Sequence, residues 1–183
     1  MKEGIRILSI DDSPFSKDDD EVLVVGVVSR GEIVEGVISF YVSVDGDDAT
    51  EKIIKKLSSS RFLRQVKLIA MNGITLGGLN IVDAEKLGSK FNLPILAITR
   101  RKPNKKAMMN AIRKSGKNVN EKLMLLEKIN KRMGASRINN LYVQYLGIKK
   151  WELEKFVEKA YPMLRLAHII ASGVVKGESK GRV

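Results

Sequence analysis

Residues 5–44 have the sequence IRILSIDDSPFSKDDDEVLVVGVVSRGEIVEGVISFYVSV, which contains three runs rich in β-branched and other apolar residues. These runs predict strands at Ile5–Ile10, Glu21–Val28 and Ile33–Val44. The short polar turn 29–32 separates the second run from the third, as in a hairpin. We therefore expect a sheet that begins with three antiparallel strands.

The middle of the chain changes to alternating strands and helices. Short apolar runs at Val66–Met71 and Ile95–Ile98 predict buried strands, and a helix that starts at Asn80 or Asp83 is expected between them. A strand, a crossover helix and a second strand at this spacing are typical of a parallel pair. Together with the antiparallel start, this predicts an α/β ribonuclease H-like domain, with a mixed sheet of about five strands and helices on both faces.

Four helices and one edge strand are expected in the rest of the chain. The helices lie at Ala107–Lys114, Asn118–Met133, Lys149–Ala160 and Leu164–Ala171. Trp151 is expected on the buried side of the third of these helices, and Leu141–Leu146 is the predicted edge strand. Residues 173–183 are rich in Gly, Lys and Arg, and we expect them to form a basic tail on a single domain of residues 1–183.

The positive charge of the chain is concentrated in one stretch. Of the 33 Lys and Arg residues, 13 lie between Arg100 and Arg137, together with only 2 of the 21 Asp and Glu residues. Such a stretch favours nucleic acid as the partner, although a solvated basic face would have the same composition. The candidate contacts are Arg100, Arg101, Lys102, Lys105, Lys106, Arg113, Lys114 and Lys117.

The composition also excludes some classes of protein. The absence of cysteine excludes disulfides, thiolate metal sites and cysteine nucleophiles, and it suits a cytoplasmic protein. No apolar run approaches the roughly 20 residues of a membrane span. We expect a cytoplasmic protein without a membrane partner, and the composition does not predict its oligomeric state.

Acidic residues follow two of the predicted strands. Asp11 and Asp12 come after the first strand, and Asp45, Asp47 and Asp48 come after the third. Mg²⁺ prefers oxygen ligands at about 2.1 Å, and a bound Mg²⁺ activates water and offsets phosphate charge. The acids therefore predict a divalent-metal site, although acids at strand ends also serve as turn residues and helix caps.

Asn72 and His168 complete the set of candidates. Asn72 follows the predicted fourth strand, where a third acid would stand in a metal-dependent nuclease built on such a sheet. His168 is the single histidine and lies within the apolar run LRLAHII at 164–170. It is either a core histidine or a residue that transfers a proton near the metal.

Five ordered blocks of sequence resemble an archaeal family of unknown function that is related to endonuclease V. They are IDDSPF at 10–15, VDGDDAT at 44–50, NGITLGGLNIVD at 72–83, AITRRKP at 97–103 and ASGVVKGES at 171–179. Endonuclease V nicks DNA or RNA near inosine with a divalent metal. The resemblance therefore implies an endonuclease V-like fold, Mg²⁺ or Mn²⁺ as cofactor, and DNA or RNA as partner.

The resemblance also implies roles for single residues. Asp11 matches the first-strand metal aspartate of endonuclease V, and Asn72 falls where its fourth-strand aspartate stands. Arg100 falls at a lysine after the next strand, and His168 falls at a histidine on the C-terminal helix. Each of these matches is an expectation about geometry as well as about chemistry.

Two functions remain open at this point. The first is a metal-dependent endonuclease with Asp11, Asp45, Asn72 and His168 as catalytic residues, and with Asp11, Asp45, Asp47 and Asn72 as metal ligands. The second is a non-catalytic nucleic-acid-binding module that keeps the nuclease fold. Asn72 favours the module because it lacks the charge of an acid, whereas the other three catalytic candidates favour the enzyme.

Overall fold

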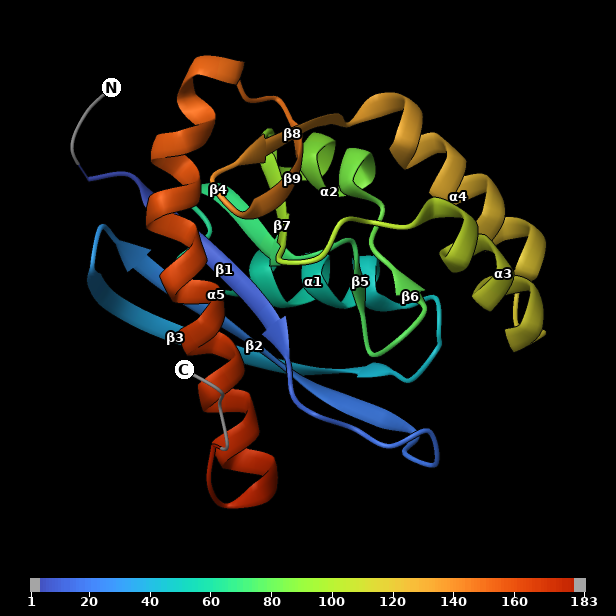
Figure 1. The fold of residues 1–183 in the computed structure, drawn as a ribbon. Helices are drawn as coiled ribbons and strands as arrows, with labels where there is room; N and C mark the ends of the chain where they lie inside the picture. The colour runs from blue at the N-terminus through green and yellow to red at the C-terminus, as the bar shows by residue number, and fades with distance from the viewer. Residues whose placement is uncertain (1–3, 180–183) are drawn as a thin grey trace.

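The computed structural model describes residues 4–179, whose main sheet has seven strands (Figure 1). These strands are β1 (Arg6–Asp12), β2 (Glu21–Arg30), β3 (Ile33–Ser43), β4 (Val66–Asn72), β7 (Ile95–Thr99), β8 (Gly134–Ile138) and β9 (Leu141–Leu146). A separate ribbon consists of β5 (Thr75–Leu76) and β6 (Asn80–Ile81). The helices are α1 (Ala49–Ser58), α2 (Ala84–Phe91), α3 (Lys105–Ser115), α4 (Val119–Arg132) and α5 (Leu153–Lys176), which follows a 3-10 turn at Lys150–Glu152.

The strand order is β3-β2-β1-β4-β7-β9-β8. The first three strands pair antiparallel, as predicted, and β1 then pairs parallel with β4 and β4 parallel with β7. The last two strands, β9 and β8, return to antiparallel pairing. The carboxyl ends of β1, β4 and β7 therefore meet at one edge of the sheet, which is where Asp11 and Asn72 stand.

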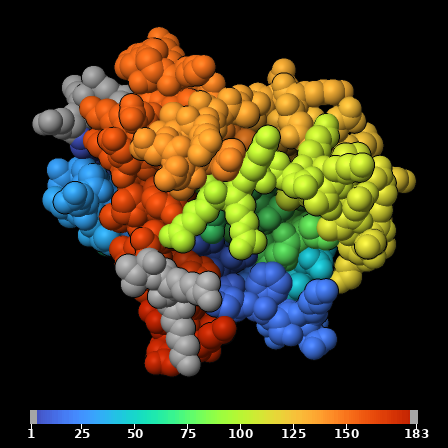
Figure 2. Space-filling model, in the orientation of Figure 1, coloured from blue at the N-terminus to red at the C-terminus, as the bar shows by residue number. Residues whose placement is uncertain are grey.

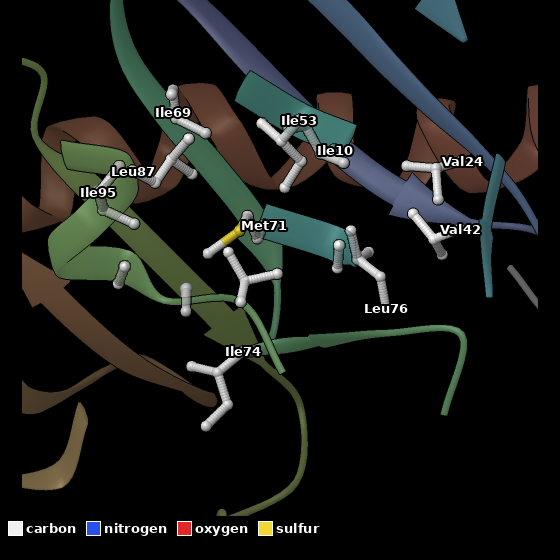
Figure 3. Packing of buried hydrophobic residues seen from close by; sticks show 14 of the residues in the cluster. Ile10, Val24, Val42, Ile53, Ile69, Met71, Ile74, Leu76, Leu87 and Ile95 are labelled. Atoms are coloured by element: carbon white, nitrogen blue, oxygen red, sulfur yellow. The ribbon is translucent and has the colours of Figure 1, made fainter. Parts of the chain in front are cut away.

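Helices cover both faces of the sheet, as predicted. On one face, side chains such as Ile10, Met71 and Ile95 pack with Ile53 of α1 and Leu87 of α2 (Figure 3). On the other face, α5 lies across β1, β2 and β4 (Figure 1). The ends of β1 and β4 therefore lie between two packed layers, which fixes their positions.

Two details of the predicted sheet are wrong. The sheet has seven strands rather than about five, because all six runs predicted as strands belong to it and β8, with the short and half-exposed sequence GASRI, adds a seventh. As a result β9, predicted as an edge strand, lies between β7 and β8. Alternation of apolar residues cannot distinguish such a short polar strand from a loop.

The two predicted C-terminal helices are one continuous helix, α5, which contains Pro162. Proline removes a backbone donor and normally interrupts a helix. Here the buried positions Phe156, Ala160, Leu164 and Ala167 continue across Pro162 at helical spacing, and their burial stabilises the helix on both sides of it.

Two further expectations concern the ends of this helix. Trp151, expected to be buried, is 74% exposed because it lies in the 3-10 turn before α5. The predicted basic tail begins inside α5, which ends at Lys176, and residues 180–183 lie outside the described part of the chain. Within residues 4–179, no helix is long and apolar enough to cross a membrane.

Candidate functional site

Asp11, Asp12 and His168 form a cluster at the carboxyl end of β1, here called the acid–histidine cluster. Each residue offers one potential ligand atom, and these atoms lie within 4.8 Å of one another. Nδ1 of His168 lies 3.7 Å from Oδ2 of Asp11 and 2.8 Å from the backbone carbonyl oxygen of Asp12. Because a carbonyl oxygen only accepts hydrogen bonds, this contact places the proton of a neutral imidazole on Nδ1 and leaves Nε2 as an acceptor.

Asn72 lies beside Asp11. The parallel register aligns Ile10 of β1 with Met71 of β4, so the next residues in each strand are neighbours at the strand ends. Nδ2 of Asn72 lies 3.2 and 3.1 Å from the two carboxylate oxygens of Asp11, to which it donates. The backbone N–H of Asp12 donates to Oδ1 of Asp11 at 2.9 Å. These donors partly offset the negative charge of a carboxylate that is only 3% exposed.

Burial dominates the protonation of both acids. Desolvation and the neighbouring charge of Asp12 raise the pKa of Asp11 to about 8, against the lowering effect of its hydrogen bonds from Asp12 and Asn72. Desolvation also raises the pKa of Asp12, opposed by a hydrogen bond from Gly77 and by His168. A divalent cation would offset the charge that burial penalises, and carboxylate ligands suit Mg²⁺ and Mn²⁺. The donor set of the cluster therefore fits such an ion.

The loop after β5 connects the cluster to Asp45. The N–H of Gly77 donates to Oδ2 of Asp12 at 2.6 Å, and the carbonyl oxygen of Gly77 accepts from the N–H of Asp45 at 2.8 Å. Oδ1 of Asp45 accepts from the N–H of Leu79 at 2.8 Å. A side chain at residue 77 would approach Val22 to 2.7 Å and would need φ +56°, so glycine allows this close fit. Asp45 is thus hydrogen-bonded to the loop that holds Asp12.

Asp45 and Asp47 have other partners. The carbonyl oxygen of Asp45 accepts from Nζ of Lys122 at 2.6 Å, and the carboxylate of Asp47 accepts from Asn118. Among residues 4–179, the close group of acid and histidine ligands contains neither of them. The structure brings together Asp11, Asn72 and His168, and it adds Asp12. Metal ligation by Asp45 and Asp47 stays a prediction.

The predicted nucleic-acid contacts lie on the loop after β7, on α3 and in the turn that follows α3. All eight are exposed, and none forms an ion pair with any residue between 4 and 179. By contrast, Lys128, Lys131 and Arg132 of α4 are paired with acids. Residues 100–117, here called the basic segment, therefore carry positive charge that no acid of the described chain neutralises by contact. In Figure 2, lime-coloured side chains after β7 project from the face that also presents α5.

Arg100 is held against α5. Its Nε donates to the hydroxyl of Tyr161 at 2.6 Å, and its guanidinium carbon lies 5.9 Å from the centre of that ring. Tyr161 precedes His168 by seven residues, about two helical turns, so both lie on one side of α5. Arg100 and the two acids of the acid–histidine cluster thus contact the same side of α5, through Tyr161 and His168.

A hollow of about 230 Å³ adjoins Asn72. The strand ends, the loop before α3 and the side of α4 line it, and the polar side chains of Thr99, Asn104, Asn130 and Gln144 take part. These groups supply hydrogen-bond donors and acceptors beside an apolar wall formed by residues such as Met108. A small polar ring could therefore be recognised beside the cluster.

Asp12 and Tyr161 were not predicted as site residues. Asp12 had a signal in the sequence, since two adjacent acids follow the first strand, but only Asp11 was assigned as a ligand, because Asp11 matches the first-strand metal aspartate of endonuclease V. Tyr161 had no such signal, because its partner Arg100 is 61 positions away in the chain.

Comparisons with known proteins show the family of this chain. A family model described as Endonuclease dU matches residues 3–175. A UPF0215 protein of Methanothermobacter thermautotrophicus is 37% identical over 189 residues, which cover 99% of this chain and 93% of that protein. A UPF0215 protein of Thermococcus sibiricus is 37% identical over 191 residues, which cover 98% of this chain and 97% of that protein.

Two solved structures have a similar fold. A protein of unknown function from Archaeoglobus fulgidus superposes with a TM-score of 0.83 at 34% identity, covering 93% of this chain and 98% of that one. Endonuclease V of Ciona intestinalis, crystallised with DNA that contains inosine, gives 0.60 at 11% identity, covering 96% and 87%. The second likeness concerns the fold alone, which is ribonuclease H-like as predicted. The family match and the archaeal relatives together establish that this chain belongs to the Endonuclease dU family.

Proposed function

We propose that this protein is a divalent-metal-dependent endonuclease that cuts a nucleic-acid strand at or near a deaminated base. The observation that carries the proposal is the pair of buried Asp11 and half-buried Asp12, with His168 and Asn72 beside it, at the carboxyl edge of an endonuclease V-like sheet. Two acids with raised pKa values are costly to a fold unless a cation is bound there.

Asp11 and Asp12 would hold the metal, with Asn72 as a neutral neighbour. When bound, Mg²⁺ or Mn²⁺ polarises a phosphate oxygen and lowers the pKa of a coordinated water. His168 has a separate role, because the carbonyl of Asp12 holds its Nδ1 and leaves Nε2 to accept or return a proton. Arg100 and the other basic residues of the basic segment would hold the phosphates of the strand.

The hollow beside Asn72 supports a modified base as the recognised group. An enzyme that examines a base in a duplex takes it out of the stack and reads its edge by hydrogen bonds. The amide side chains of Asn104, Asn130 and Gln144 line a space next to the proposed metal ligands. Deoxyuridine is the first substrate to test, given the description of the family, and inosine is the second, given the DNA bound to the endonuclease V neighbour.

A binding module without catalysis is the second candidate. Asn72 favours it, because an amide in place of an acid gives the metal one charge less. The exposed charge of the basic segment serves binding equally well, with or without cleavage.

One experiment separates the two functions. Labelled oligonucleotides with deoxyuridine, inosine or only standard bases are incubated with the protein in Mg²⁺, in Mn²⁺ or in EDTA. The enzyme predicts metal-dependent nicking of a modified substrate and its loss in Asp11→Ala. The module predicts that the wild type and Asn72→Asp bind every substrate but leave it intact.

A further inference from the structure

Arg137 and Tyr142 form a pair on the β8–β9 hairpin, outside the basic segment. The guanidinium carbon of Arg137 lies 5.6 Å from the centre of the Tyr142 ring, and its Nε donates to the carbonyl oxygen of Asn139 at 3.2 Å. Arg137 is exposed and forms no ion pair with any residue in the range 4–179. Its charge is therefore open to an external anion.

This pair repeats the arrangement of Arg100 and Tyr161. In both pairs the guanidinium lies over a tyrosine ring and its Nε donates to an internal oxygen. The two terminal nitrogens of each guanidinium are left for a further acceptor. A guanidinium held in this way loses less conformational freedom when it binds a phosphate in a bidentate manner.

Strand register places Arg137 at the same end of the sheet as Asn72, one residue beyond the row to which Asn72 belongs. Asn72 of β4 is opposite Ile98 of β7, Thr99 of β7 is opposite Tyr142 of β9, and Tyr142 is opposite Arg137 of β8. From β1 to β8 there are four strand spacings, or about 19 Å at about 4.8 Å each. One strand of a duplex carries a phosphate about every 3.4 Å along the axis, so this distance corresponds to about five or six nucleotides.

We propose that Arg137, supported by Tyr142, is a distal phosphate contact for a nucleic-acid strand that crosses the carboxyl edge of the sheet. The strand passes the acid–histidine cluster and Arg100 before it reaches the hairpin. This inference rests on the proposed function for its ligand, and it adds a second anchor on one side of the cut. The contact is to the backbone and carries no base preference.

Arg61 provides a matched control. It is also exposed, lies over an aromatic ring, Phe62, at 4.8 Å, and forms no ion pair with the described residues 4–179. It precedes the start of β4 and is therefore at the opposite end of the sheet from Asn72. Arg61→Ala removes the same charge as Arg137→Ala without touching the proposed path.

The test is a fluorescence anisotropy titration in EDTA, over a range of salt, with labelled duplexes that carry one deoxyuridine. One arm of the duplex is kept long and the other ends about three nucleotides from the deoxyuridine, and a second duplex has the arms exchanged. Arg137→Ala should lower the log–log salt slope by about 0.9 on one duplex and leave it unchanged on the other. Tyr142→Leu should lower the affinity for the same duplex several-fold. The Tyr142→Phe and Arg61→Ala variants should bind it as tightly as the wild type does.

Equal slopes for Arg137→Ala and Arg61→Ala would overturn the inference, as would an Arg137→Ala effect that persists on both duplexes. Thermal unfolding of each variant shows whether it is folded, and Arg137→Lys, which keeps the charge but not the bidentate fork, should give an intermediate affinity. Because EDTA prevents metal-dependent cleavage, the result is independent of the nuclease assay. A protein that never nicks DNA but shows the Arg137 effect would refute the cleavage proposal and retain this contact.

Discussion

Replacing Asp11 by Asn should stabilise the metal-free protein at neutral pH. The folded protein raises the pKa of Asp11 from 3.8 to about 8. An acid with a raised pKa binds its proton more tightly in the folded state, so the free energy of unfolding falls as pH rises from the ordinary pKa towards the folded one. The window of this loss therefore runs from about pH 4 to about pH 8.

The size of the effect follows from the same difference. Between 3.8 and about pH 7 there are about three pH units, and each corresponds to 1.36 kcal/mol, which gives a ceiling of about 4 kcal/mol. Asn has the shape of Asp and keeps an oxygen for the N–H of Asp12. Relaxation around the site reduces the ceiling, so we expect Asp11→Asn to gain about 2 kcal/mol near pH 7 and almost nothing near pH 4.

Urea unfolding in EDTA at several pH values measures this difference. Asp48→Asn is the control of opposite sign. Burial alone would raise the pKa of Asp48, but hydrogen bonds from Asn80 and Ser43 outweigh it and hold that pKa below its usual value. The stabilisation that ionised Asp48 contributes is present above its ordinary pKa and is lost on acidification. Asp48→Asn should therefore lose stability at neutral pH. A gain for Asp11→Asn that does not change with pH would refute the electrostatic explanation.

Three further results are expected. Asn72→Asp should bind Mn²⁺ more tightly than the wild type in calorimetry and should be less stable in EDTA, because a third carboxylate joins a buried site. His168→Ala should lower the nicking rate more than the Mn²⁺ affinity, because its imidazole is placed to transfer a proton rather than to hold the metal. Leu87→Ala should cost about 2–5 kcal/mol in urea unfolding, because this side chain is fully buried between α2 and the sheet.

The sequence predicts most of the fold because its elements have strong local signals. The antiparallel strands 21–30 and 33–43 are long and β-branched, and Asp83 caps α2 by accepting from the N–H of Lys86, one of the two starts considered. The misses have a different cause. β8 is stabilised by pairing with β9, and the continuation of α5 across Pro162 by packing on β1 and β2, so neither has a complete signal in its own residues.

The candidate site also divides into residues with a local signal in the sequence and residues that depend on distant parts of the chain. Asp11, Asn72 and His168 were found because they end strands or interrupt an apolar helix, and the structure brings them together. The orientation of Asp45 could not be found in this way, because its φ of 53° and its contact with Leu79 depend on a loop about 30 residues later in the chain.

Asn72 makes the metal-free site less costly to fold than an acid at this position would. Its amide donates to both oxygens of Asp11, whereas an aspartate would add a third negative charge at the same place. The proton held by Asp11 near neutral pH must leave before a metal binds, so metal affinity should rise with pH up to about 8. The same amide therefore lowers the electrostatic cost of folding without metal and lowers the affinity for it. This predicts that metal binding releases close to one proton below about pH 7, and calorimetry in buffers of different ionisation enthalpy would measure that release. A release that does not change between wild type and Asp11→Asn would show that the proton comes from another group.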